Sequence, residues 1–390
     1  MNPYVLSIST LFPSTARPAF GRFVANQMAA LARRSDVDLL MVNPLGVPPW
    51  PLSRREPYAC EAAVPRAAML DGVPVSHPRF PLIPVIGGDT NPARIAHAVL
   101  PMVRQLHRQR PFDLVDAQFF FPDGPAAALI AADLGLPLSI KARGSDIHYW
   151  GTRPKARQQM LAAANQASGM LAVSGTLRQD MAALGMPEER ISVHYTGLDH
   201  ARFHPTPRAA ARAALGLTGG PLFVCPGALI AIKGQAFAIQ ALAAIPGARL
   251  ALAGAGPDEA SLRALAQRLG LADRVLFLGQ VGHDVLPQWL SAADAVVLPS
   301  EREGLANAWI EALACGAPLV IPDIGGAAEV VSTPSAGRLA KRTPQAIADA
   351  LQQILAAPPA QAEVAANVAR FSWEANAAQL SAHYHRLAGR

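Results

Sequence analysis

Residues 295–314 read AVVLPSEREGLANAWIEALA, and their pattern indicates the architecture of the chain. The first five of these residues form a short apolar run that is typical of a buried strand, and the last seven have helical spacing. Residues 300–307 are therefore expected to connect a strand to a helix, which is where open α/β sheets bind ligands. This places Glu303 in the loop and Glu311 inside the helix.

The spacing of these two carboxylates indicates what they could bind. Eight helical positions span roughly 12 Å and turn through about 80°, which is too far for an acid/base pair. The separation suits a long ligand held at both ends, with a diphosphate facing the helix N-terminus between them. Gly304 removes the Cβ that would keep phosphate oxygens from the backbone. The alternative is that Glu303 only favours the positive end of a helix while Glu311 is a solvated helix residue.

This segment resembles the retaining glycosyltransferases of family 4, whose signature is a Glu pair at this spacing. The resemblance implies the GT-B fold, an α/β architecture of two doubly wound Rossmann-like domains that face a central cleft, with a C-terminal helix crossing back to the N-terminal domain. It implies that Glu303 orients the reacting sugar and that Glu311 binds the ribose. Donor contacts are expected from Glu303, Gly304, Leu305, Ala306, Asn307 and Glu311.

Strand-like runs alternate with helical ones along the chain, which predicts parallel sheets. In the first half the expected strands are residues 4–10, 37–43, 114–117, 138–141, 170–173 and 191–194. In the second half they are residues 222–226, 249–253, 275–278, 295–299 and 318–321. We expect an N-terminal acceptor-side domain at 1–199, a linker at 200–220, a nucleotide-sugar domain at 221–370 and a crossover helix at 371–390. The alternative for the last segment is an ordinary C-terminal helix.

Composition limits the class of protein. A length of 390 residues with 51% hydrophobic content suggests two domains, and Pro, Gly or charges interrupt every apolar run before membrane-span length. Residues 4–10 do not read as a secretion signal, which favours a cytoplasmic protein. The three cysteines lack metal-ligand spacing and are expected to be reduced, mostly buried thiols. Neither a metal nor a cofactor is expected.

The net charge of +6 comes largely from arginine. A basic surface could serve an acidic donor, anionic lipid or nucleic acid, but no dense Lys/Arg block with interleaved aromatics argues for nucleic acid. Peripheral contact with the inner face of a membrane is a further hypothesis, since many relatives use lipid-linked acceptors. Its candidate residues are Arg33, Arg34, Arg104, Arg108 and Arg110.

Residues 226–234, PGALIAIKG, follow the first strand of the second domain and resemble the family's phosphate-binding turn. Gly227 and Lys233 match donor-binding positions of this turn, although a lone lysine is more often a surface residue. By this resemblance, Ala228 stands at the position of the family's customary Arg. Arg143 and Arg302 are the candidates to supply the missing cation.

Two further segments of the second domain are expected to contact the donor. Gly254 lies in a Gly-x-Gly after the next strand, but Glu259 stands where a dinucleotide fingerprint would have its third glycine. By resemblance, the backbone around Val281 recognises the nucleotide base. Neither segment distinguishes uracil from guanine.

The first domain carries two loops that resemble family motifs. Gly21 matches a glycine beside the donor phosphates, and could equally be a turn residue. The strand at 138–141 is followed by an acceptor-side loop, within which Asp146 is the expected polar catalytic residue or, alternatively, a turn former. Gln118 stands where many relatives have a His. A catalytic role for a histidine at that position therefore cannot be carried over to this chain. The acceptor-side residues are Arg143, Gly144, Ser145, Asp146 and His148.

Together these motifs predict a retaining glycosyltransferase that moves a sugar from a nucleoside diphosphate sugar to a glycan, lipid-linked or small-molecule hydroxyl. Glu303, Lys233 and Asp146 are the expected catalytic residues. Two alternatives remain open: an epimerase or hydrolase on the same fold, and a non-catalytic nucleotide-sugar-binding protein. The donor sugar and base, the acceptor and the oligomeric state are not predicted.

Overall fold

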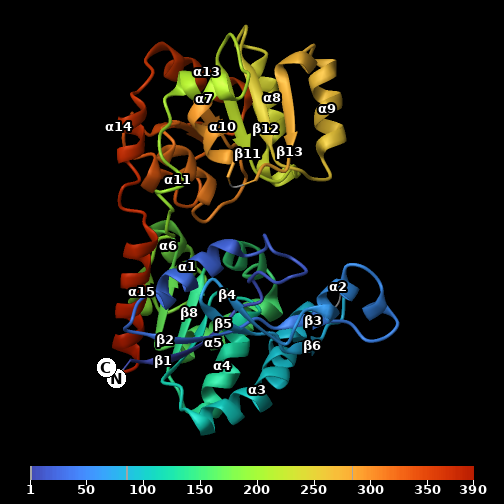
Figure 1. Cartoon of the computed structure of the whole chain (residues 1–390), viewed down its shortest axis with the longest axis vertical. Coiled ribbons are helices and arrows are strands. Elements are labelled where there is room, and N and C mark those ends of the chain that lie inside the picture. The colour runs from blue at the N-terminus through green and yellow to red at the C-terminus, as the bar shows by residue number, and fades with distance from the viewer. Residues whose placement is uncertain (1, 85–86, 283) are drawn as a thin grey trace. The chain divides into compact units, whose positions relative to one another are not determined.

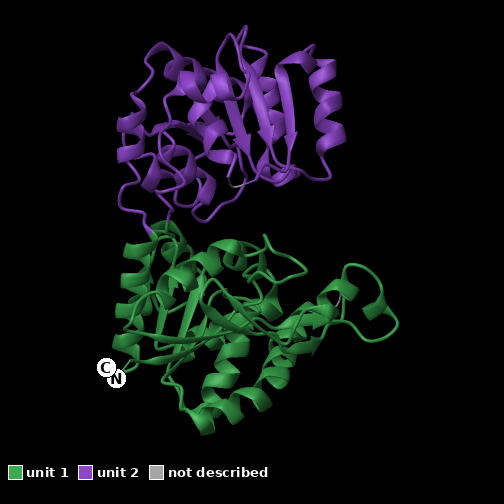
Figure 2. Cartoon of the chain, in the orientation of Figure 1, with its two compact units in different colours: residues 1–197, 373–390 green, residues 198–372 purple. Residues whose placement is uncertain are grey.

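The computed structural model describes residues 2–84, 87–282 and 284–390. The chain forms two compact units (Figure 2), one from residues up to Gly197 together with Trp373–Arg390, the other from Leu198–Ser372. Residues 200–220, expected as a linker, lie within the second unit, where α7 (Arg208–Ala214) packs against α10 (Leu286–Ala292).

The described part of the first unit contains an eight-stranded sheet (Figure 1). Its neighbours pair in parallel except for the antiparallel hairpin at one edge, formed by β4 and β5. In spatial order the strands are β10 (Ile191–Val193), β9 (Gly169–Ala172), β8 (Leu138–Ala142), β7 (Leu114–Ala117), β1 (Tyr4–Ile8), β2 (Asp38–Val42), β5 (Val73–Ser76) and β4 (Ala67–Leu70). Short strands β3 (Leu45–Val47) and β6 (Arg79–Pro81) pair separately.

The second unit is built on a six-stranded parallel sheet among its described residues. In spatial order its strands are β13 (Val275–Gly279), β12 (Arg249–Ala253), β11 (Leu222–Pro226), β14 (Ala295–Val297), β15 (Leu319–Ile321) and β16 (Gly337–Leu339). The predicted doubly wound α/β fold of each half is thereby confirmed. The sequence patterns missed β16, β3, β6 and the β4–β5 hairpin, because strands this short carry little periodicity.

Helices cover both sheets, and their apolar faces build separate cores. The first unit contains α1 (Arg22–Ala32), α2 (Tyr58–Ala63), α3 (Asn91–Gln109), α4 (Asp123–Leu134), α5 (Pro154–Gln166), α6 (Gly175–Ala183) and α15 (Trp373–Leu387). The second contains α7, α8 (Gln235–Leu242), α9 (Glu259–Arg268), α10, α11 (Asn307–Ala314), α12 (Ala327–Val330), α13 (Pro344–Ala356) and α14 (Gln361–Ala366).

The last helix, α15, belongs to the first unit, as the fold prediction expected. It lies beside α1 (Figure 1), and Leu380 and Tyr384 are fully buried in the same cluster as Val24 and Met28 of α1. The chain therefore leaves the first unit after Gly197 and re-enters it at α15. No described helix has both the length and the apolar character that crossing a bilayer requires.

Candidate functional site

The strand order of the second sheet reverses at its first strand. β11 pairs with β12 on one side and with β14 on the other, so the loops that follow β11 and β14 leave the sheet side by side. Ligands of open α/β sheets bind at such a switch point, beyond the carboxyl ends of the strands. The two loops are residues 227–234 and 298–306, and the second leads into α11. Both were predicted as donor-binding segments.

Lys233 and Glu303 meet where these two loops come together. The Nζ atom of Lys233 lies 2.5 Å from Oε1 of Glu303, and the side chains are 25% and 13% exposed. The loops are also joined by their backbones, because the amide of Glu301 donates to the carbonyl of Ile232 at 2.7 Å. Two residues predicted from separate motifs, 70 positions apart, thus form one partly buried ion pair.

Arg342, which the sequence reading missed, fastens the same two loops. Its Nε donates to the carbonyl of Pro299 at 2.8 Å, and one terminal nitrogen donates to the carbonyl of Ala231 at 3.1 Å. Another terminal nitrogen lies 3.8 Å from the carboxylate of Glu301. Arg342 follows β16 and belongs to no recognisable motif, so only the tertiary structure identifies it.

A glycine turn after β15 supports the Glu303 loop from a third direction. The amide of Gly326 donates to the carbonyl of Gly304 at 2.7 Å. A Cβ on Gly325, whose φ is 50°, would lie 2.1 Å from the carbonyl oxygen of Glu303. No side chain fits in that space, so glycine at 325 allows the turn to hold the Glu303 backbone in place.

The Gly254-x-Gly256 segment proves to be a packing element for the phosphate-binding turn. A Cβ on Gly254 would lie 1.9 Å from the carbonyl oxygen of Gly227, and one on Gly256 would lie 2.3 Å from that of Leu229. The amide of Leu229 in turn donates to the carbonyl of Ala255 at 3.0 Å. These contacts account for both glycines without a bound dinucleotide; a donor contact by Gly254 stays a prediction.

Helix α11 begins at Asn307, with Ala306 as its N-cap residue, so the predicted helix N-terminus lies directly after the Glu303 loop. Leu305 is buried and anchors the end of that loop. Glu311 lies on α11 and is partly buried. Burial raises the pKa of Glu311 to about 7, an effect that the positive charge of Arg202 opposes. The carboxyl group thus titrates near neutral pH.

The predicted first-unit loops follow β1 and β8, which lie on either side of β7 in the sheet. Gly21 precedes α1 with a φ of 65°, and a Cβ there would lie 2.4 Å from the carbonyl oxygen of Leu11. Asp146 is fully buried, and its carboxylate accepts backbone amides from Phe120 at 2.7 Å, Gly144 at 2.8 Å and Arg143 at 3.0 Å. Asp146 therefore organises this loop, and its contact with an acceptor stays a prediction.

Arg143 and Gln118 belong to one buried polar network. The guanidinium of Arg143 donates to the backbone carbonyl of Gln118 at 2.9 Å and to its side-chain Oε1 at 2.6 Å. Gln118 also donates to Asp116 at 2.7 Å and to the Tyr384 hydroxyl at 3.3 Å. These bonds engage two of the three guanidinium nitrogens of Arg143. Arg302, the other cation suggested to compensate for Ala228, is half exposed, and its Nε lies 3.6 Å from a carboxylate oxygen of Glu301.

The remaining predicted residues lie in both units. Ser145 is exposed beside Asp146, and Nε2 of His148 lies 2.8 Å from a carboxylate oxygen of Asp180, which gives this histidine a partner on α6. Val281 follows β13 and is partly exposed, and its contact with a nucleotide base stays a prediction. Within the described residues, no group of three or more His, Cys, Asp or Glu side chains could hold a metal ion.

Comparisons with known proteins match both halves of the chain. Residues 20–202 match the model of Glycosyltransferase Family 4, and residues 207–382 match that of glycosyl transferases group 1. "Putative teichuronic acid biosynthesis glycosyltransferase TuaC" of Bacillus subtilis is 28% identical over 89% of this chain and 88% of its own. D-inositol 3-phosphate glycosyltransferase of Mycolicibacterium gilvum is 37% identical, but the match spans only 47% of this chain and 44% of that protein.

Solved structures show the same fold over nearly the full length. Sucrose-phosphate synthase from Thermosynechococcus elongatus has a TM-score of 0.78 at 21% identity, with 99% of each chain covered. Anabaena Alr3699/HepE, solved in complex with UDP, has a TM-score of 0.74 at 22% identity and covers 99% of this chain and 100% of its own. With both halves matched and each unit doubly wound, the chain belongs to the family 4 glycosyltransferases of the two-domain GT-B type.

Proposed function

We propose that this glycosyltransferase is a retaining, metal-independent enzyme that moves a hexose from a UDP- or GDP-linked sugar to an acceptor hydroxyl. The observation that carries the proposal is the Lys233–Glu303 pair at the switch point of the second sheet, next to the N-terminus of α11. Structures of Anabaena Alr3699/HepE in complex with UDP and with UDP-glucose support a nucleotide-sugar donor. The acceptor class is a glycan, lipid-linked or small-molecule hydroxyl.

The proposed site supplies positive potential where the leaving diphosphate gains charge. An ammonium group carries three N–H donors, so Lys233 can hold Glu303 and a phosphate oxygen at once. The unpaired amides at the start of α11 favour an anion. In a closed site such electrostatic stabilisation can reach several kcal/mol, which makes a metal ion unnecessary for charge balance.

In the proposed reaction the bond from the sugar C1 to the diphosphate oxygen breaks through an oxocarbenium-like state. The acceptor oxygen forms its bond to C1 on the same face, so the configuration at C1 is retained. A β-phosphate oxygen takes the proton from the acceptor hydroxyl. Glu303, fixed by Lys233, orients the sugar hydroxyls, and Glu311 accepts hydrogen bonds from the ribose.

A donor screen followed by product analysis tests this proposal. Thermal shift against UDP- and GDP-linked sugars identifies the donor, because a bound ligand raises the apparent stability by mass action. Proton NMR of the transfer product then reports the configuration at C1. Lys233→Ala and Glu303→Ala should lower turnover strongly, whereas Lys155→Ala and Glu363→Ala, matched changes at exposed sites, should not.

The same assays separate the alternatives. An epimerase or hydrolase would form product without any acceptor, and a binding protein would give calorimetric donor binding with no turnover on any acceptor. An inverted configuration at C1, or full activity of both Lys233→Ala and Glu303→Ala, would overturn the proposed mechanism.

A further inference from the structure

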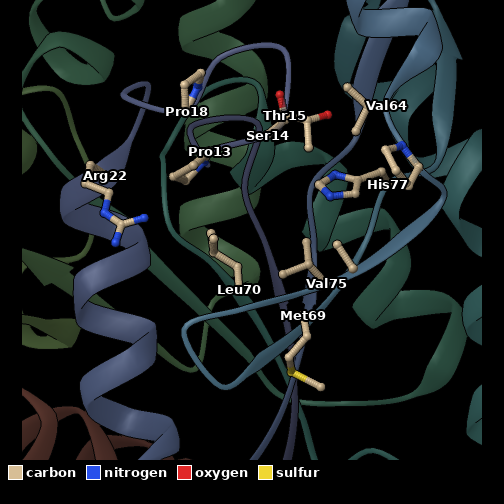
Figure 3. A pocket seen from close by; sticks show the side chains of 12 residues that line it. Pro13, Ser14, Thr15, Pro18, Arg22, Val64, Met69, Leu70, Val75 and His77 are labelled. Atoms are coloured by element: carbon tan, nitrogen blue, oxygen red, sulfur yellow. The ribbon is translucent and has the colours of Figure 1, made fainter.

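A pocket of about 230 Å³ lies wholly within the first unit, between the loop that follows β1 and the β4–β5 hairpin (Figure 3). Most of its lining is apolar, with Pro13, Pro18, Val64, Leu70 and Val75 among the contributors. An engineered apolar cavity of roughly 150 Å³ already accommodates benzene. The pocket is therefore large enough for a substituted aromatic ring or a branched aliphatic group.

One buried polar atom of a side chain in this lining lacks a hydrogen-bond partner. His77 is 3% exposed, and its buried Nδ1 atom has no hydrogen-bond partner. Burial lowers the pKa of His77, which keeps the imidazole neutral at physiological pH. A neutral imidazole has one donor and one acceptor nitrogen, and leaving a buried one unpaired costs roughly 1–3 kcal/mol. A ligand hydroxyl could pair with Nδ1 in either tautomer.

The one arginine in the lining does not make this a site for anions. Arg22 forms an exposed ion pair with Asp71 at 2.7 Å, so a carboxylate already lies beside its guanidinium and links the hairpin to the start of α1. Asp71 and Gly72, with φ of 50° and 83°, form the two-residue turn of that hairpin. Arg22 also follows Gly21, so one wall of the pocket continues into the predicted Gly21 loop.

We propose that this pocket binds an uncharged, apolar group carrying a hydroxyl, and that this group is the non-reacting part of the acceptor. Ser14 and Thr15 place two further hydroxyls in the lining. The binding group is recognised by its shape and by one hydrogen bond to His77. The claim that the bound group is part of the acceptor rests on the proposed transferase function. The claim that the pocket binds an apolar group with a hydroxyl does not.

Phenol and toluene provide a matched pair of probes, because they differ in one hydroxyl. Each is titrated into the full-length protein labelled with ¹³C at histidine Cε1, without donor, and the His77 resonance is identified by its loss in His77→Phe. Phenol should shift this resonance and bind about tenfold more tightly than toluene, the ratio expected for one buried hydrogen bond. His77→Phe should remove the preference, as read by competition calorimetry.

His77 is buried, so His77→Phe could disturb the folding of the chain. Two variants at exposed positions of β4 therefore test the pocket without changing His77. Ala68→Trp fills the pocket from β4, whereas Ala67→Trp adds the same side chain at a neighbouring exposed position outside the lining. Ala68→Trp should abolish phenol binding and raise the KM for acceptor more than tenfold, with donor affinity unchanged. Ala67→Trp should leave phenol binding, the acceptor KM and the donor affinity as in the wild type.

The outcomes separate this inference from the proposed function. Equal binding of phenol and toluene, or phenol binding that survives Ala68→Trp, would overturn the pocket chemistry even in an active transferase. An unchanged acceptor KM in Ala68→Trp would overturn the acceptor assignment. If no transfer occurs with any acceptor while phenol still binds as described, the acceptor assignment fails together with the proposed function, and the pocket chemistry stands.

Discussion

The ammonium nitrogen of Lys233 lies 2.5 Å from Oε1 of Glu303, so the loop after β11 and the loop after β14 are joined by the two side chains expected to act on the donor. Neither residue can be changed without altering the environment of the other. Their effects on the donor should therefore be coupled, and this coupling can be measured.

A double-mutant cycle with Lys233→Met and Glu303→Gln should be strongly non-additive. Lys233→Met leaves an unpaired carboxylate facing an anionic diphosphate, so it should weaken donor binding more than the double variant does. We expect a coupling energy of about 1–3 kcal/mol from calorimetry of the four proteins. Additive losses would show that the pair does not act on the donor as a unit.

Donor binding should depend on pH through Glu311. Because its pKa is raised to about 7, the group is mostly protonated at pH 6 and mostly ionised at pH 8. An ionised carboxylate is the better acceptor for ribose hydroxyls, so donor affinity should rise across this interval. A sugar diphosphate diester has no group that titrates there. Glu311→Gln should flatten the profile, and an unchanged profile in that variant would contradict the ribose role.

Glu311 should also make the free energy of unfolding depend on pH. Donor affinity should rise with pH, whereas the stability of the fold should fall. A folded-state pKa above the unfolded value near 4.5 means that folding favours the protonated form. This contribution is present below pH 4.5 and is lost as the pH rises through about 7. Relative to Glu311→Gln, the wild type should lose about 1–3 kcal/mol of unfolding free energy over this range in denaturant titrations. A parallel decline in both proteins would assign the change to other groups.

Arg342→Ala should lower activity although Arg342 is not expected to touch the reacting atoms. Its hydrogen bonds to Pro299 and Ala231 hold together the loops that carry Glu303 and Lys233. We expect kcat/KM to fall roughly tenfold, since small displacements in a catalytic site are costly, with partial rescue in Arg342→Lys. Arg338→Ala is the control, because Arg338 is a partly exposed arginine on β16 whose hydrogen bonds go to Gln353, Pro334 and Gly337 rather than to these loops. Equal losses in both variants would indicate a general stability effect.

Gly325→Ala should displace the Glu303 loop. The added Cβ would lie 2.1 Å from the Glu303 carbonyl oxygen, a contact that the backbone cannot accept without moving. Gly270→Ala is a matched control, because Gly270 has a φ of 66° and a Cβ there would meet nothing within 4 Å. Both changes carry backbone strain of about 1 kcal/mol, but only Gly325→Ala should also reduce turnover strongly. Similar turnover in the two variants would exclude a role for this turn in holding Glu303.

The amino-acid sequence by itself determined the two doubly wound sheets. Runs such as residues 222–226 and 250–253 are apolar because parallel strands are buried on both faces, and the structure places strands at Leu222–Pro226 and Arg249–Ala253. It also located the segments around Lys233 and Glu303, since strand-to-helix loops carry recognisable glycines and charges. These are local properties, readable over ten to twenty residues.

The contacts between distant residues became visible in the folded chain. The tertiary structure joined Lys233 to Glu303 and identified Arg342 as the residue that holds their loops together. It also showed that the Asp146 carboxylate binds four backbone amides, while the catalytic role of Asp146 stays a prediction. The structure also placed His77 in an apolar pocket that no sequence motif predicted. The contacts of Arg342 with the two loops and of Lys233 with Glu303 link positions 43 to 111 residues apart. They depend on strand order and loop packing, which local patterns of hydrophobicity and charge do not encode.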